Sequence, residues 1–169
     1  MTRELDFVDF VAARWKSLYR LAYLLTASPT AAEDMLQTAL EKAYVNWARI
    51  SRMEYPEAYV RRMLAHAVVS SGRRGWLREV PSIEMPERSD EPVEVGVLDR
   101  SLLWPLVCAL PARQRAVIVL RYYEDLTEAQ ISEVLGCAPG TVKSQASAAM
   151  KALRRALAAS GVGEVLGES

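Results

Sequence analysis

Residues 127–145, which read TEAQISEVLGCAPGTVKSQ, decide how this chain folds. Thr127 followed three residues later by Gln130 is the pattern of a capping box, in which each side chain satisfies a backbone N–H group at the start of a helix. Gly136 suits the end of that helix because glycine adopts left-handed backbone angles at little cost. Pro139 fits the first turn of the next helix. The segment predicts helices over 127–135 and 139–157 joined by a short turn, a helix-turn-helix.

The second helix of such a motif places its N-terminal part in the major groove of DNA. Here the outward-facing side chains belong to Thr141, Lys143, Ser144 and Gln145. Hydroxyl and amide groups can reach base edges, and an ammonium can reach a phosphate or guanine. The segment therefore predicts DNA binding, and the alternative is a helical hairpin that only packs against its neighbours.

Upstream of this motif the pattern stays helical. Leucines and valines from Leu98 to Leu110 recur at helical spacing. Pro105 lies inside this run and predicts that the helix is kinked or restarts there. Pro111 opens a further helix that extends through Tyr123. The C-terminal part of the chain is therefore predicted to be a small helical domain over residues 98–160, followed by a glycine-containing tail over 161–169.

Residues 80–94 contain three prolines and five acidic side chains. Prolines remove backbone donors, and acidic side chains resist burial, so this stretch disfavours a packed helix. We predict a linker over residues 79–97, which separates the C-terminal domain from an N-terminal domain over residues 1–78.

Three helices are predicted in the N-terminal domain. The first ends at Ser28-Pro29, the second begins with a capping box of Thr30 and Glu33 and extends to about Arg49, and the third extends from Pro56 to about Arg74. The apolar stripe of the first helix comprises Phe7, Phe10, Val11, Trp15, Leu18, Leu21, Ala22 and Leu25. The fold class is predicted to be all-α, with two small helical domains.

The 21 basic and 21 acidic side chains give a formal net charge of zero, which by itself argues against nucleic-acid binding. The charges are unevenly placed. Residues 51–80 hold six basic side chains against three acidic ones, whereas residues 81–100 hold two against six. Neutrality is therefore the sum of a basic segment and an acidic segment that follows it.

Two polar surfaces of the predicted N-terminal domain are candidate binding sites. The third helix and the residues after it carry basic side chains interleaved with an aromatic one, a combination suited to phosphate pairing and base stacking; they are Arg61, Arg62, His66, Arg73, Arg74 and Trp76. The second helix carries Asp34, Gln37 and Glu41 opposite its apolar stripe, as a partner-binding face would. The alternative in both cases is a solvated face, and Trp76 is equally suited to a core.

No grouping in the sequence suits catalysis or metal binding. His66 is the single histidine, and Cys108 and Cys137 form no CxxC pair and are predicted to be small buried side chains. Phosphate-binding glycine loops and zinc-protease motifs are absent. We predict no enzyme activity, no catalytic residue, no metal and no cofactor. No apolar run is long enough to span a bilayer, and no signal peptide is seen, so a cytoplasmic protein is expected.

Taken together, these motifs resemble the extracytoplasmic-function (ECF) sigma factors of bacterial RNA polymerase, which contain only regions 2 and 4 of the sigma-70 family. Residues 32–44, AEDMLQTALEKAY, are similar to the region 2.2 signature. Residues 110–115, LPARQR, and 120–122, LRY, are similar to the opening of region 4, and Leu135-Gly136 with residues 140–144, GTVKS, to its helix-turn-helix. The continuation Gln145-Ala146-Ser147 and the short length resemble an actinobacterial subgroup.

The resemblance implies a sigma factor that binds the β and β′ subunits of core RNA polymerase and recognises the −10 and −35 promoter elements, with an anti-sigma factor as a possible further partner. It assigns Asp34, Gln37, Glu41 and Lys42 to polymerase. It assigns the six basic and aromatic residues of 61–76 to the −10 element. It assigns Arg121, Thr141, Lys143, Ser144, Gln145 and Lys151 to the −35 element.

The chain departs from the family pattern at several of these positions. His66, Val68, Ser71 and Gly72 replace residues common at the −10 surface, and Gln145 and Ala148 replace basic residues common in region 4. Ala138 replaces the usual serine cap of the recognition helix, at a cost of about 1 kcal/mol. We therefore predict −35 binding that is weak or depends on a partner. A stand-alone helix-turn-helix regulator with a helical sensor domain is the alternative function.

The free chain is accordingly predicted to bind promoter DNA poorly at physiological salt, because its net charge is zero and counterion release contributes little. Fluorescence anisotropy with a labelled promoter duplex, with and without core polymerase, measures this directly. Tight sequence-specific binding by the chain alone would contradict the prediction.

Overall fold

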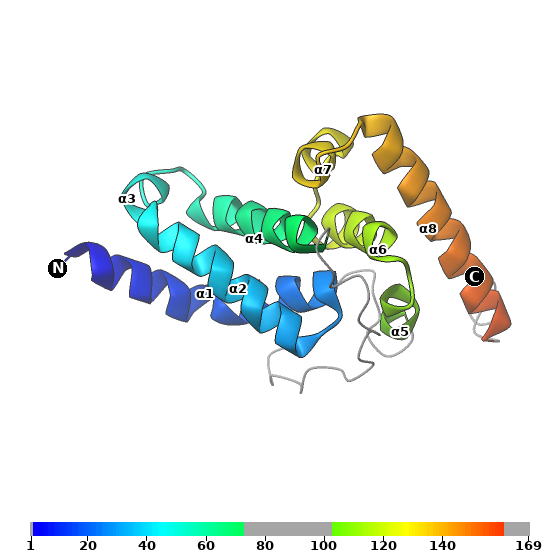
Figure 1. Cartoon of the computed structure of the whole chain (residues 1–169), viewed down its shortest axis with the longest axis horizontal. Coiled ribbons are helices and arrows are strands. Elements are labelled where there is room, and N and C mark those ends of the chain that lie inside the picture. Colours follow the sequence, from blue (N-terminus) through cyan, green and yellow to red (C-terminus); the bar gives the residue numbers. More distant parts are fainter. Residues whose placement is uncertain (1, 73–102, 161–169) are drawn as a thin grey trace, which may run out of the picture. The chain divides into compact units, whose positions relative to one another are not determined.

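The computed structural model describes residues 2–72 and 103–160 of the chain. The chain divides into two compact units, Met1–Ser82 and Ile83–Ser169. Across the two described ranges every regular element is helical and no β-strand occurs (Figure 1). This confirms the predicted all-α class. Among the described residues, no helix is both long enough and apolar enough to cross a membrane.

The first unit is built from three long helices that pack against one another. They are α1 (Thr2–Thr26), α2 (Pro29–Val45) and α4 (Pro56–Gly72), with the short α3 (Trp47–Ile50) between the last two. In Figure 1 the blue α1 and the cyan α2 run alongside each other and α4. The core contains Leu18, Leu21, Leu25, Leu36, Ile50, Val60 and Leu64, all fully buried. Because this burial removes apolar surface from water, it is the main force that holds the three helices together.

Helix α2 begins at Pro29 and is capped by Ser28, so the predicted Thr30–Glu33 capping box is wrong. The Ser28 Oγ accepts a hydrogen bond of 3.3 Å from the Ala31 backbone N–H. Proline is favoured at the first helical position because its missing N–H would have no partner there. With Pro29 in that position, Thr30 already lies inside the helix and cannot cap it.

Helix α2 also ends earlier than predicted, at Val45 instead of near Arg49. The Asn46 side chain donates to the Lys42 carbonyl at 2.9 Å, and its backbone N–H reaches the same oxygen at 3.3 Å. Asparagine competes with the helical hydrogen-bond pattern in this way, and α3 then starts at Trp47 as a separate turn.

Trp15 was predicted to face the core, but its side chain is 45% exposed. Residues rotate by about 100° each along an α-helix, so Trp15 lies about 60° around α1 from the fully buried Leu18. It therefore stands at the edge of the apolar stripe. The other predicted members follow the stripe, with Phe7, Phe10 and Val11 half-buried and the leucines buried.

The second unit comprises α5 (Trp104–Cys108), α6 (Ala112–Ile118), a π-helical turn η2 (Val119–Tyr123), α7 (Glu128–Leu135) and α8 (Pro139–Ala159). Helix α8 packs against α5, α6 and α7. Pro105 lies in the first turn of α5, so a helix starts there, whereas residues 98–102 of the predicted helix lie outside the described residues. The inward side of α8 buries Val142, Ala146, Ala149 and Leu153, whereas Met150 and Leu157 are only half-buried.

The helix-turn-helix is present as predicted. The Thr127 Oγ1 accepts from the Gln130 backbone N–H at 3.2 Å, and the Gln130 Oε1 accepts from the Thr127 N–H at 2.9 Å, which completes the capping box. Gly136 closes α7 with φ of 63°, in the left-handed region that favours glycine. Pro139 starts α8, and Ala138 provides no side-chain cap.

Two neighbouring substitutions distinguish the observed helix start from the predicted one. Ser28→Ala should lower the free energy of unfolding by about 1 kcal/mol, because the Ala31 N–H loses its acceptor. Thr30→Ala is the matched control and should change it by less than about 0.5 kcal/mol, since Thr30 is exposed. Urea unfolding followed by circular dichroism measures both values. A larger loss for Thr30→Ala would contradict the assigned start of α2.

Candidate functional site

One side of α2 is a continuous polar face. Asp34, Gln37, Glu41 and Lys42 are all exposed, and the Gln37 Nε2 donates to the Glu41 Oε1 at 3.4 Å. The opposite side of the helix buries Ala32, Leu36, Ala39, Leu40 and Ala43. Because the buried side anchors the helix in the first unit, the polar side is presented to solvent in a fixed orientation.

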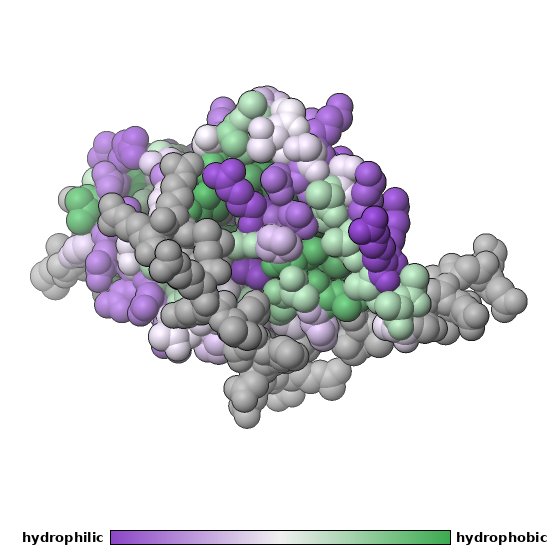
Figure 2. All heavy atoms as spheres, turned by 45° about the vertical axis from the view of Figure 1, so that its right-hand side comes forward, coloured by the Kyte–Doolittle hydropathy of each residue, from purple (hydrophilic) through white to green (hydrophobic). Residues whose placement is uncertain are grey.

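Beyond this polar face, the end of α2 exposes apolar surface that the sequence patterns did not single out. Val45 is 73% exposed and Tyr44 is 45% exposed. The Tyr44 ring meets Phe7 of α1 edge-on, with ring centroids 5.2 Å apart, and Phe7 also contacts Trp47. On the face visible in Figure 2, hydrophobic areas in green lie beside hydrophilic areas in purple. Helical periodicity gave no signal here, because it assigns apolar residues to a core.

The basic face of α4 is only partly available to a ligand. Arg62 and His66 are exposed one helical turn apart, and the His66 Nδ1 lies 3.4 Å from the Ser70 Oγ. These two side chains can approach a phosphate or a base. Arg73, Arg74 and Trp76, which the sequence assigned to the same surface, lie outside the described residues.

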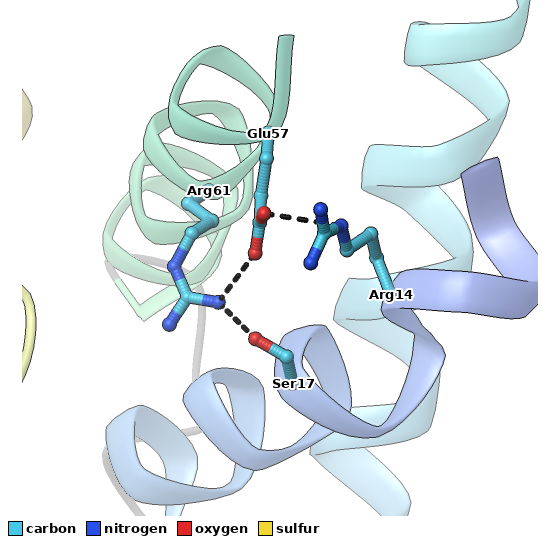
Figure 3. Close-up of polar contacts among 4 residues, drawn as sticks. All are labelled: Arg14, Ser17, Glu57 and Arg61. Carbon is cyan, nitrogen blue, oxygen red and sulfur yellow. Dashed lines mark hydrogen bonds and ion pairs between the residues drawn. The ribbon is translucent and has the colours of Figure 1, made fainter. Parts of the chain in front are cut away.

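Arg61, the remaining member of the predicted basic face, is held inside the first unit (Figure 3). Its Nη1 lies 3.6 Å from the Glu57 Oε1 and also donates to the Ser17 hydroxyl of α1. Glu57 in turn pairs with the Arg14 Nε of α1 at 3.1 Å. The sequence grouped Arg61 with Arg62 because they are adjacent, but the two side chains have different surroundings.

The start of α8 presents the predicted base-reading residues. Lys143 and Ser144 are exposed, and Thr141 and Gln145 are half-buried. The Ser144 Oγ donates to the Thr141 carbonyl at 3.0 Å, so its hydrogen is engaged in the helix. Lys151 is exposed two turns further along α8. The surface combines small polar groups near the helix start with a cation further along.

Hydrogen bonds hold the turn against the last turn of α7. The Ser132 Oγ donates to the Cys137 carbonyl at 2.5 Å, and the Cys137 N–H donates to the Ser132 carbonyl at 3.2 Å. Cys137 is half-buried, so the prediction that it is a buried side chain is wrong, whereas Cys108 is buried as predicted. A turn residue has neighbours on one side only, which explains the difference.

Arg121, a predicted DNA-binding residue, lies in η2 and contacts the start of α7. Its Nη1 is 3.7 Å from the Glu128 Oε1, and its guanidinium lies 5.8 Å from the centre of the Tyr122 ring. Both Arg121 and Glu128 are substantially exposed, so the ion pair is weak and a phosphate could replace the carboxylate.

Arg115 is a structural residue that the sequence analysis did not identify. Only 3% of Arg115 is exposed to solvent. Its Nη1 donates to the carbonyls of Cys108 at 3.1 Å and Leu110 at 3.4 Å. Burial lowers the pKa of the guanidinium below its ordinary value and raises the pKa of the Cys108 thiol to about 11. Arg115 thereby connects the end of α5 to α6. Its place in the LPARQR motif was the sequence feature that could have indicated this structural role.

No group of three or more His, Cys, Asp or Glu side chains that could hold a metal ion occurs within residues 2–72 and 103–160. The exposed faces are instead suited to macromolecular contacts through hydrogen bonds and charge.

Comparisons with known proteins show the family to which the chain is related. Residues 101–153 match the family model described as Sigma-70, region 4. The chain is 35% identical over 159 residues to the RNA polymerase sigma-E factor of Streptomyces coelicolor, covering 94% of this chain and 90% of that protein. It is 33% identical over 150 residues to the ECF RNA polymerase sigma factor SigL of Mycobacterium tuberculosis, covering 86% and 85% respectively.

A solved structure has a similar fold. The sigma factor RpoE in complex with the anti-sigma factor NepR from Bartonella quintana matches with a TM-score of 0.61 and 24% sequence identity. The match covers 90% of this chain and 96% of that one.

Removal of the Arg115 guanidinium tests its structural role. Arg115→Met should lower the free energy of unfolding by about 2–3 kcal/mol, because two buried carbonyls lose a charged donor. Arg113→Met, at an exposed position of the same helix, is the control and should change it by less than about 0.5 kcal/mol. Chemical unfolding followed by circular dichroism compares the two, and equal losses would contradict the assigned role.

Proposed function

Because this chain belongs to the extracytoplasmic-function family of RNA polymerase sigma factors, we propose that its exposed polar faces divide polymerase and promoter contacts between the two units. The chain directs transcription initiation by binding core RNA polymerase and by recognising promoter DNA, as members of this family do. The residues that make each contact are the subject of the proposal.

Core polymerase is assigned to the polar face of α2. Asp34, Gln37, Glu41 and Lys42 are exposed along two turns of a helix whose opposite side is fully packed. This orientation is the observation that carries the assignment, because a rigid helix face loses little conformational freedom on binding. The partner surfaces are the β and β′ subunits, as the family resemblance implies. A stand-alone regulator has no need for such a face.

The −10 element is assigned to the basic side of α4 and the residues that follow it. Arg62 and His66 are exposed there, and Arg73, Arg74 and Trp76 continue the same basic and aromatic sequence. Arginine pairs with phosphates, and an aromatic ring can stack on an unpaired base. Such groups suit a strand that is being separated.

The −35 element is assigned to the second unit. The start of α8 offers Thr141, Lys143, Ser144 and Gln145 for a major groove, with Arg121 and Lys151 for phosphates. Since Ala138 gives no side-chain cap and Gln145 and Ala148 are uncharged, we expect this unit to bind its duplex weakly without polymerase.

The proposal also divides the chain into regions and places it in the cell. We assign residues 1–78 to region 2, residues 79–97 to a linker and residues 98–160 to region 4, with 161–169 as a tail. The chain would act in the cytoplasm, where polymerase and promoter DNA meet, and would leave the chemistry of RNA synthesis to polymerase. Control by an anti-sigma factor is supported by the solved relative, which was determined with one bound.

Capture by core polymerase tests the α2 assignment. The variant Asp34→Ala with Gln37→Ala should reduce the retained chain by about tenfold or more, because buried interface hydrogen bonds are lost. Glu133→Ala removes an exposed acid from α7 and should leave capture unchanged. Quantitative pull-down on immobilised core polymerase measures all three chains. Equal capture of the double variant and the original chain would refute the assignment, and no capture of either would favour a stand-alone regulator.

A further inference from the structure

We propose that Arg61 is a positioning residue, which fixes the rotation of α4 against α1 so that Arg62 and His66 face promoter DNA. The inference rests on the proposed −10 contacts of α4. It separates two adjacent arginines that the sequence assigns to the same task.

A set of side-chain contacts links one turn of α1 to one turn of α4 (Figure 3). Glu57 and Arg61 are one turn apart on α4, and Arg14 and Ser17 are about one turn apart on α1. Glu57 binds the Arg14 guanidinium at 3.1 Å and the Arg61 guanidinium at 3.6 Å, and Arg61 also donates to the Ser17 hydroxyl. Four side chains thus join the two helices through directional contacts.

Burial separates Arg61 from a DNA contact. The Arg61 side chain is only 15% exposed, compared with 51% for Arg14 and 32% for Glu57. To reach a phosphate, Arg61 would have to leave both Glu57 and Ser17, and the half-buried carboxylate would lose a partner. Losing both the ion pair with Glu57 and the hydrogen bond to Ser17 is unfavourable at this partly buried position, so Arg61 remains with its partners. Arg62 is exposed and is available to a phosphate.

The apolar core by itself holds α4 less precisely in rotation. Val60, Leu64 and Val68 are buried, but burial of apolar side chains is not directional. A rotation of α4 by about 20° would move side-chain atoms at its outer radius of about 5–6 Å by about 2 Å, enough to break a hydrogen bond to DNA. The contacts of Arg61 with Ser17 and Glu57 oppose that rotation. Arg61 directly precedes Arg62 in α4 and lies between one and two turns before His66.

The test uses the full chain in a holoenzyme with core polymerase. Its promoter is a fragment that this holoenzyme selects from genomic DNA in run-off transcription. The binding constant for the fragment is measured against KCl concentration for Ser17→Ala, Arg61→Met, Arg61→Lys and the double variant Arg62→Met with His66→Ala. Arg61→Met is then repeated in the background of that double variant. Circular dichroism confirms that each variant is folded at the assay temperature.

We expect Arg61→Met to weaken binding by about tenfold and Ser17→Ala to weaken it in the same direction, since each breaks the contact between α1 and α4. Arg61→Lys should recover part of the loss, because an ammonium can still pair with Glu57. In the Arg62→Met, His66→Ala background, Arg61→Met should cause no further loss, because the two side chains that it positions are absent.

Two results would overturn the inference. If Arg61→Met in that background lowers the slope of log K against log [KCl] by a further value of about 1, Arg61 itself contacts a phosphate. If Arg61→Met in the original chain leaves binding unchanged, its contacts only stabilise the fold. Failure of the proposed −10 surface is a separate result, because then the Arg62→Met, His66→Ala variant would bind as well as the original chain.

Discussion

Helix α2 can bury only one of its sides, and the proposed polymerase-binding surface of the first unit depends on that constraint. Leu36, Ala39, Leu40 and Ala43 are packed in the core, so Asp34, Gln37 and Glu41 must point outward. The same division occurs in α8, where Val142 and Ala146 are buried and Lys143 and Ser144 are exposed. In both helices the apolar contacts set the orientation, and the polar side is left exposed for the contacts that we propose.

Buried and half-buried arginines add direction to this packing. Arg115 donates to two carbonyls at the end of α5, and Arg61 joins α4 to Ser17 of α1. An apolar core tolerates small rotations and shifts, whereas hydrogen bonds to charged donors weaken steeply when their geometry changes. A protein that must hold separate surfaces for polymerase and DNA gains from such contacts, because its two units are small and their cores are limited.

The two predicted capping boxes show where local sequence is sufficient and where it is not. Thr127 and Gln130 form theirs because Leu126, which precedes them, offers no competing side-chain cap. Thr30 and Glu33 have the same spacing, but Pro29 precedes them and is better suited to the first helical position, so Ser28 becomes the cap. The motif is therefore only as reliable as the residues beside it. The prediction that Trp15 faces the core is wrong for a related reason. Helical periodicity identifies an apolar stripe, but it does not show which edge of the stripe the neighbouring helices cover.

The sequence by itself determined the helical class, the helix-turn-helix with its turn at Gly136, and the family, because these depend on local spacing and on motifs read along one chain. It also located the candidate residues of α2, α4 and α8. The tertiary structure decided which of these candidate side chains are exposed to solvent and which are held by other residues. Arg62 is exposed, Arg61 is held by Glu57 and Ser17, and Arg121 is paired with Glu128. Ser17 is 44 residues from Arg61 in the chain, so only the packing of α1 on α4 brings them together.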